Sequence, residues 1–207
     1  MAVYTKLSKE QLVDFFKKYD LGELINFNEI TDGIENTNYF VKTEKGKFIL
    51  TLYEKRVDEK DLPFFIGLMK NLFNKKFPSP EPIINKNGNY ISEILNKKAA
   101  VVSFIDGKAK KNLDPGDCFE AGIYTAKLHM ITKDLPGKRK NKLSISSWSE
   151  IYDKVKNNCS KIHKNLPKTI EENLKNIEEN WPKNLPAGII HADLFPDNIF
   201  FKNKKLS

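Results

Sequence analysis

Long hydrophobic runs are absent from this 207-residue chain. No apolar stretch approaches the roughly 18 residues that suggest a membrane-spanning helix, and the opening MAVYTKLSKEQ lacks the apolar core of a secretory signal. We therefore expect a cytoplasmic protein without a membrane partner. Hydrophobic residues make up 40% of the chain and charged residues 30%, which is ordinary for a folded globular protein, so disorder is not expected.

Cysteine, familiar ligand motifs and excess negative charge are also lacking. Cys118 and Cys159 lie far apart without CxxC or Cys/His spacing, so neither a disulfide framework nor a zinc site is indicated. No GxxxxGK[ST] motif is present, which argues against a Walker-type nucleotide site. The formal charge is +8, but the lysines are spread over turns and polar helix faces. That spread favours a solvated surface over a nucleic-acid partner.

The first half of the chain is typical of a small antiparallel sheet with helices. Ser8 and Gln11 have the spacing of a capping box at the start of a helix that stops before Gly22. Alternating aromatic and aliphatic residues predict strands at 38–40, 48–53, 90–95 and 99–104. Asp58 opens a second helix between the two pairs of strands.

After Asp106 the pattern changes to helices, which places a lobe boundary there. Residues 1–105 are expected to form an N-terminal nucleotide-binding lobe with its hinge, and residues 106–207 part of a helical lobe. The sequence DPGD at 114–117 caps a helix. Apolar stripes predict one helix over 148–162 and another over 170–181, with Thr169 as the cap of the second. Short apolar runs predict strands at 188–190 and 199–201.

The loop HADLFPDN at residues 191–198 carries the clearest chemistry. It brings His191, Asp193 and Asn198 onto one tight connection between the two predicted strands. Phosphoryl transfer needs a carboxylate that accepts the proton of the attacking hydroxyl, and oxygen ligands that hold magnesium against the phosphates. Asp193 and Asn198 are residue types that supply these two groups.

The pattern HxDxxxxN resembles the catalytic loop of the aminoglycoside phosphotransferase and choline kinase superfamily, relatives of the protein kinases. More narrowly, the chain resembles the bacterial homoserine kinases of that superfamily. The matching stretches are TDGIENTNYFV at 31–41, FILTLYEKR at 48–56, AAVVSFIDG at 99–107, AKLHMITKDLPGKRKN at 126–141 and GIIHADLFPDNIFF at 188–201. The resemblance implies an α+β, protein-kinase-like fold of two lobes, a small antiparallel-sheet N-lobe and a helical C-lobe that is incomplete in this chain.

By this resemblance, Asp193 is the catalytic base, Asn198 is a magnesium ligand, and His191 braces the catalytic loop. ATP and Mg²⁺ are the implied cofactors. The resemblance also places the segment TDGIENTNYF where kinases have their glycine-rich loop.

Within that segment, Gly33, Asn36 and Thr37 would bind the nucleotide, although the same residues are equally typical of a plain hairpin turn. Thr51 stands where kinases carry a phosphate-pairing lysine in the third strand. Lys55 is the first candidate to replace that lysine.

Lys42 is the next candidate to replace that lysine. For both Lys55 and Lys42, the alternative is a solvated lysine without a role in nucleotide binding.

Arg139 and Asn141, in PGKRKN, could face the carboxylate of an amino-acid substrate, because a guanidinium suits such a group. A solvated basic loop is the alternative interpretation.

The activity implied by the resemblance is transfer of the ATP γ-phosphate to the side-chain hydroxyl of L-homoserine, which gives O-phospho-L-homoserine for threonine biosynthesis. A kinase for another small alcohol or an aminoglycoside, and a non-catalytic kinase relative, remain alternatives. The sequence does not indicate the oligomeric state. Strand 199–201 runs into the turn KNKK and the chain stops where a returning strand should begin. We therefore expect an inactive fragment with an unpaired apolar strand edge.

Overall fold

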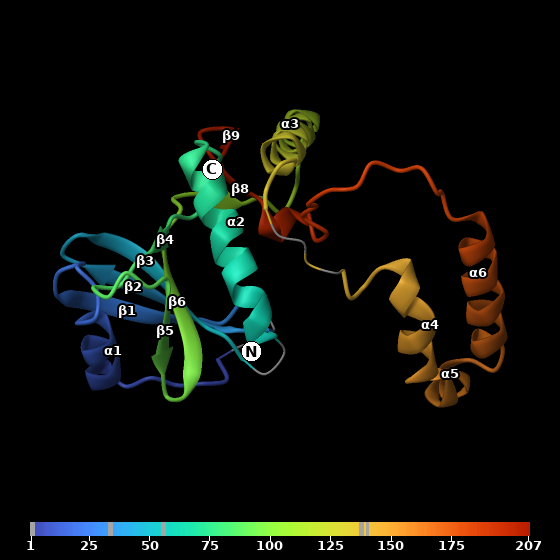
Figure 1. The fold of residues 1–207 in the computed structure, drawn as a ribbon, viewed down its shortest axis with the longest axis horizontal. Coiled ribbons are helices and arrows are strands. Elements are labelled where there is room, and N and C mark those ends of the chain that lie inside the picture. The colour runs from blue at the N-terminus through green and yellow to red at the C-terminus, as the bar shows by residue number, and fades with distance from the viewer. Residues whose placement is uncertain (1–2, 33–34, 55–56, 137–138, 140) are drawn as a thin grey trace. The chain divides into compact units, whose positions relative to one another are not determined.

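The computed structural model describes residues 3–32, 35–54, 57–136, 139 and 141–207. The chain forms two compact units, the first made of residues 1–137 and 188–207 and the second of residues 138–187. The first unit contains both β-sheets with helices α1 to α3, and the second contains α4 to α6 (Figure 1). The lobe boundary near residue 106 falls between the two sheets of the first unit and stays a prediction.

The larger sheet of the first unit has six strands within the described residues, each antiparallel to its neighbours. These strands are β1 (Leu24–Ile30), β2 (Thr37–Thr43), β3 (Gly46–Leu52), β4 (Pro82–Ile83), β5 (Ile91–Ile94) and β6 (Lys97–Ser103). Their order is β1-β2-β3-β6-β4, with β5 paired to β6. The predicted β2–β3 hairpin and the predicted β5–β6 pair are confirmed.

Alternation of side chains decides which face of this sheet is buried. One face packs on α1 (Lys9–Phe16) and forms the core of the unit. The enclosed side chains of that core include Leu12, Phe15, Phe16, Tyr39, Val41, Leu50, Leu52 and Val101. The intervening residues of β2, β3 and β6 point to the opposite side, which we call the outer face. It carries the half-buried side chains of Asn38, Phe40, Ile49, Thr51 and Val102.

The predicted caps of α1 and α3 are present. In the capping box of α1, Gln11 N donates to Ser8 Oγ at 3.2 Å, and Ser8 N donates to Gln11 Oε1 at 2.8 Å. Asp114 and Asp117 form the same reciprocal pair at the start of α3 (Pro115–Thr132). Both helices therefore begin where the sequence predicts.

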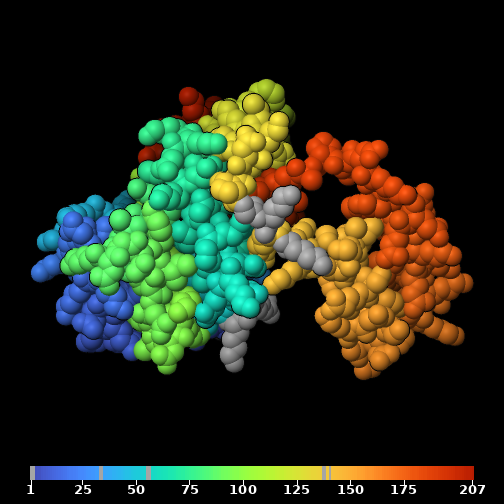
Figure 2. Space-filling model, in the orientation of Figure 1, coloured from blue at the N-terminus to red at the C-terminus, as the bar shows by residue number. Residues whose placement is uncertain are grey.

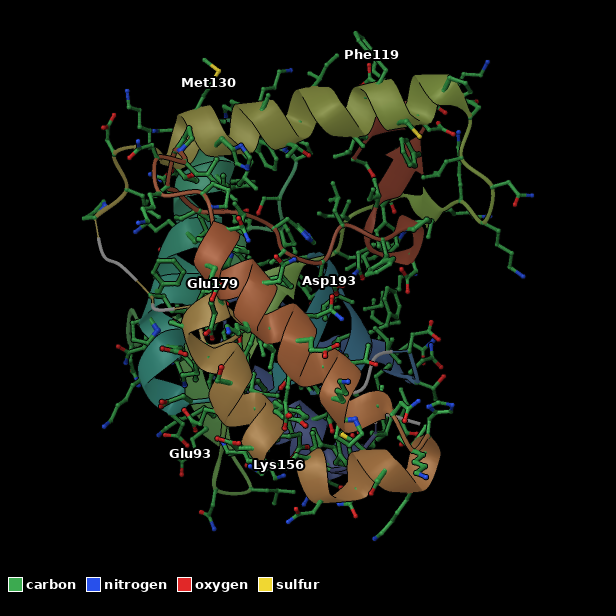
Figure 3. All side chains as sticks on the ribbon, turned by 90° about the vertical axis from the view of Figure 1, so that its right-hand side faces the viewer. Glu93, Phe119, Met130, Lys156, Glu179 and Asp193 are labelled. Carbon is green, nitrogen blue, oxygen red and sulfur yellow. The ribbon has the colours of Figure 1, made fainter. Side chains whose placement is uncertain are left out.

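Helix α2 (Leu62–Asn74) follows the 3-10 turn η1 (Glu59–Asp61), for which Asp58 is the N-cap. It runs beside β4 in Figure 1, and in Figure 2 it forms a long stretch of the surface of the first unit. On α3, Phe119 and Met130 point away from the rest of the first unit (Figure 3).

A second, smaller sheet has three strands within the described residues, β7 (Lys108–Ala109), β8 (Phe200–Lys202) and β9 (Lys205–Leu206). β8 pairs with β7 on one edge and with β9 on the other. The expectation of an unpaired apolar edge is therefore wrong. The chain reverses within two residues because Asn203 and Lys204 adopt positive φ angles of 52° and 63°, the backbone of a tight hairpin turn.

The second unit contains α4 (Ile145–Asp153), α5 (Lys156–Ile162) and α6 (Leu166–Asn180). The single helix predicted over 148–162 is wrong, because the backbone leaves the helix at Val155, a β-branched residue with φ −120°. The predicted cap of α6 is wrong as well. The hydroxyl of Thr169 donates to Asn165 O at 3.1 Å inside the first turn. Among the described helices of both units, none is long and apolar enough to cross a membrane.

Candidate active site

The loop at residues 191–198 belongs to the first unit and leads directly into β8; Figure 3 labels Asp193 on it. The strand predicted at 188–190 is wrong, because these residues have no regular secondary structure. The loop is therefore anchored mainly at its far end. There Pro196 starts the 3-10 turn η2 (Pro196–Asn198), and the next residue, Ile199, is buried.

A small apolar cluster holds that end of the loop. Ile199 and Phe201 are buried against Ala121 of α3, and Leu113 and Leu206 pack at the edge of the cluster. The position of the loop thus depends on the contact between β8 and α3.

Asp193 and Asn198 are in direct contact. Asn198 Nδ2 donates to Asp193 Oδ2 at 2.9 Å and to the backbone oxygen of Asp193 at 2.9 Å. Because the amide nitrogen of Asn198 donates to Asp193, the amide oxygen of Asn198 is directed away from that carboxylate. The second carboxylate oxygen of Asp193 takes no part in these hydrogen bonds with Asn198. A carboxylate acceptor and a neutral oxygen ligand therefore lie side by side on an exposed loop.

The residues before Asp193 hold the loop less firmly. His191 is exposed and makes no hydrogen bond with the described residues, so its bracing role stays a prediction. Ala192 has φ 65°, in the left-handed region that disfavours any residue with a Cβ. The turn that presents Asp193 is therefore strained at Ala192.

The predicted nucleotide loop is only partly described. Gly33 lies outside the described residues. Asn36 Oδ1 accepts a hydrogen bond from Glu54 N at 3.3 Å. Thr37 is fully buried; its hydroxyl donates to Glu54 Oε1 at 2.8 Å and accepts from Tyr4 N at 3.0 Å. A role for Asn36 or Thr37 in nucleotide binding stays a prediction.

Glu54 is the centre of a polar network that sequence reasoning missed. Its Oε1 accepts hydrogen bonds from the hydroxyls of Thr5 and Thr37, each at 2.8 Å, and its Oε2 accepts one from Lys97 Nζ. Burial acts to raise the pKa of Glu54, but the hydrogen bonds from Lys97, Thr37 and Thr5 outweigh it and lower the pKa below its usual value. Glu54 is two residues after the core-facing Leu52, and a carboxylate in that register signals buried partners.

By the resemblance, Thr51 stands where kinases usually carry a lysine. Here it forms a neutral pair with Asn38. Thr51 Oγ1 donates to Asn38 Oδ1 at 2.8 Å, across the β2–β3 ladder. Lys55, the first candidate to replace the lysine, lies outside the described residues. Lys42 is paired in register with Lys47, at the opposite end of the hairpin from Thr51.

The two predicted substrate residues belong to the second unit. Arg139 is exposed, and Asn141 Oδ1 accepts a hydrogen bond from Leu143 N at 2.9 Å. Their contact with a substrate stays a prediction. In the part of the chain that the structure describes, no group of three or more His, Cys, Asp or Glu side chains could hold a metal ion.

Residues 26–207 match the family model described as the phosphotransferase enzyme family. A homoserine kinase from Paramagnetospirillum magneticum is 41% identical over 201 residues, which are 97% of this chain and 62% of the relative. A homoserine kinase from Beijerinckia indica is 42% identical over 207 residues, which are 100% of this chain and 64% of the relative. The chain thus spans less than two thirds of the length of these relatives.

Solved structures show the same fold at low sequence identity. Spectinomycin phosphotransferase in complex with ADP and spectinomycin matches with a TM-score of 0.67 and 16% identity, covering 96% of this chain and 67% of that one. An aminoglycoside phosphotransferase from Alicyclobacillus acidocaldarius matches with a TM-score of 0.64 and 10% identity, covering 98% and 65%. The predicted α+β, protein-kinase-like fold is confirmed.

Proposed function

The chain belongs to the phosphotransferase enzyme family, and from this premise we propose that it provides the nucleotide site and catalytic loop of an ATP-dependent L-homoserine kinase. The observation that carries the proposal is the contact between Asp193 and Asn198 on the loop that enters β8. It joins a proton acceptor to an oxygen ligand, the two groups that phosphoryl transfer requires.

In the proposed reaction, the hydroxyl oxygen of the acceptor attacks the γ-phosphorus, and Asp193 accepts the proton of that hydroxyl. The new bond joins the side-chain oxygen to phosphorus, and the bond to the β-phosphate oxygen breaks, which releases ADP. The amide nitrogen of Asn198 donates a hydrogen bond to the Asp193 carboxylate, and this bond fixes the orientation of the proton acceptor.

The residues present fit a magnesium ion. Mg²⁺ prefers oxygen ligands and is commonly bound by one or two protein groups together with substrate phosphates. Asn198 Oδ1 is such a ligand, which leaves the second carboxylate oxygen of Asp193 to accept the proton, and a bound Mg²⁺ would neutralise phosphate charge.

The relatives support L-homoserine as the acceptor. Homoserine kinases share 41–42% of residues along nearly the whole chain, whereas the antibiotic-modifying structures share 16% and 10%. Synthesis of O-phospho-L-homoserine on the route to threonine would place the enzyme in the cytoplasm. A second acceptor class has no observation in its favour.

Ligand binding tests the proposal without requiring turnover. Thermal unfolding of the chain should shift upward with ADP and magnesium, and further when L-homoserine is added, because ligands that bind only the folded state stabilise it. L-2-aminobutyrate, which lacks the hydroxyl, is the matched control and should add less. A larger shift with choline or an aminoglycoside would overturn the acceptor. No shift with ADP and magnesium would overturn the nucleotide site itself.

A further inference from the structure

The position of the kinase lysine, Thr51, lies on the outer face of the larger sheet, directly opposite Asn38 in the β2–β3 register. Both side chains are half-buried, and they are joined by the hydrogen bond from Thr51 Oγ1 to Asn38 Oδ1 at 2.8 Å. Their neighbours on this face, Phe40, Ile49 and Val102, are apolar. The polar pair therefore lies beside apolar side chains on this part of the outer face.

The direction of the hydrogen bond decides what the pair offers to a ligand. Because Asn38 Oδ1 accepts from Thr51, the two amide hydrogens of Asn38 are directed elsewhere. No described residue accepts a hydrogen bond from them. Asn38 also lies two residues after Asn36, at the end of the predicted nucleotide loop. Its amide thus presents unused donors beside that loop.

Described lysines near this end of the hairpin are engaged elsewhere. Lys97 is paired with Glu54, and Lys98 is paired with Glu93 at 2.9 Å. Glu59, from the segment in which kinases place the partner of their strand lysine, is exposed. Among the described residues, no lysine paired with a buried carboxylate is therefore seen at Thr51.

We propose that the Asn38–Thr51 pair takes the place of the strand lysine, with the Asn38 amide donating to a phosphate oxygen of the bound nucleotide and Thr51 fixing the orientation of that amide. This inference rests on the proposed function, because it concerns the nucleotide site of the same enzyme. Asn38 is the binding residue, and Thr51 is a positioning residue that acts through it. A neutral donor supplies direction but no charge, so the phosphate charge is left to magnesium.

Asn38→Asp is the decisive variant, because aspartate has nearly the same size and still accepts the hydrogen bond from Thr51 while removing both amide donors. Calorimetric titration with ADP and magnesium should show affinity lower by on the order of 10-fold or more, since a donor to a charged acceptor is lost and a negative charge is placed beside the phosphate. Thr51→Val should cost about 3-fold, and should cost nothing further when combined with Asn38→Asp, because its effect passes through the amide.

Asn26→Asp is the matched control. It makes the same charge change on the same sheet, at an exposed position paired with Lys42 at the far end of the hairpin. It should leave ADP affinity unchanged.

Equal ADP affinity of wild type and Asn38→Asp would overturn the role of the pair and leave the proposed function standing. An equal loss of ADP affinity in Asn26→Asp would assign the effect to net charge instead of to the pair. Absence of ADP binding by the wild-type chain would contradict the proposed function and, with it, the role of the pair.

Discussion

Glu54 shows how one buried side chain can organise several segments. Its carboxylate joins Thr5 of the N-terminal segment, Thr37 at the start of β2 and Lys97 of β6, and its side chain is only 9% exposed. A buried carboxylate is stabilising only if such partners satisfy it, and removal of one side of the network leaves the other groups unpaired. The start of β2, and with it the end of the candidate nucleotide loop, depends on this network.

Glu54→Gln should lower the free energy of unfolding by about 3 kcal/mol at neutral pH, because Lys97 loses its buried partner. Urea denaturation measures the change. Glu93→Gln is the control, since Glu93 is paired with Lys98 but is 51% exposed, and it should cost less than about 0.5 kcal/mol. Equal costs for the two variants would contradict the burial argument.

The same variant has a defined pH dependence. The pKa of Glu54 lies below its ordinary value, so its contribution to stability is fully present above the ordinary glutamate pKa. It is lost as the pH falls through the lowered pKa. The difference between wild type and Glu54→Gln should therefore shrink in acid, and a difference that grows there would contradict the direction of the shift.

Ala192 stores backbone strain beside Asp193, the proposed catalytic base. Ala192→Gly should raise the free energy of unfolding by about 1 kcal/mol, because glycine has no Cβ and adopts φ 65° without steric strain. Ala126, an exposed residue inside α3, is the control with the opposite sign. Ala126→Gly should lower stability by about 1 kcal/mol. Losses of stability in both variants would show that Ala192 is not strained.

At the scale of elements, β8 links the candidate catalytic loop at residues 191–198 to α3. Phe201 is 6% exposed in the cluster with Ala121, and Lys110 Nζ lies 4.9 Å from the centre of its ring. Lys110 also pairs with Asp117 of the α3 cap at 2.5 Å. The first turn of α3, β8 and the loop before it are therefore expected to loosen together.

Phe201→Ala should cost about 3 kcal/mol and increase amide hydrogen exchange in residues 191–198, because the far end of the loop loses its buried anchor. The adjacent Phe200 is 42% exposed, and Phe200→Ala should change stability by less than about 1 kcal/mol. Unchanged exchange of the loop in Phe201→Ala would show that β8 does not hold it.

Elements with a local chemical signal were predictable, and elements that depend on distant partners were not. The capping residues Ser8 and Asp114 fixed two helix starts, because side chain and backbone bond within one turn. The strand predicted at 188–190 failed because an apolar run of that length forms a strand only with a neighbour to pair with.

The candidate site divides in the same way. Asp193 and Asn198 were recognisable because both groups stand within six consecutive residues of the chain. Asn38 and Glu54 were not singled out, because the roles of both depend on strand register across β2, β3 and β6. A half-buried Asn opposite Thr51 becomes visible only when the hairpin is paired residue by residue.

At the scale of the whole molecule, the two units differ in how much apolar surface they bury. Within the described part of the second unit, only Tyr152 and Cys159 are buried, and Ile162 and Leu185 stay 80% and 61% exposed. Polar contacts such as Tyr152 Oη to Glu171 Oε1 at 3.1 Å, and the edge-to-face contact of Trp148 with Trp181, supplement this small core. Such contacts offset little of the conformational entropy that folding costs.

Native-state amide hydrogen exchange should therefore separate the units. Peptides from α4, α5 and α6 should exchange well before peptides from β2, β3 and β6, because local opening is easiest where few apolar groups are buried. α1 is the internal control, since it is as short as α4 but buries Leu12, Phe15 and Phe16 against the larger sheet, and it should exchange late. Protection of α4 to α6 equal to that of α1 would mean that the second unit is stabilised by more than the contacts within it.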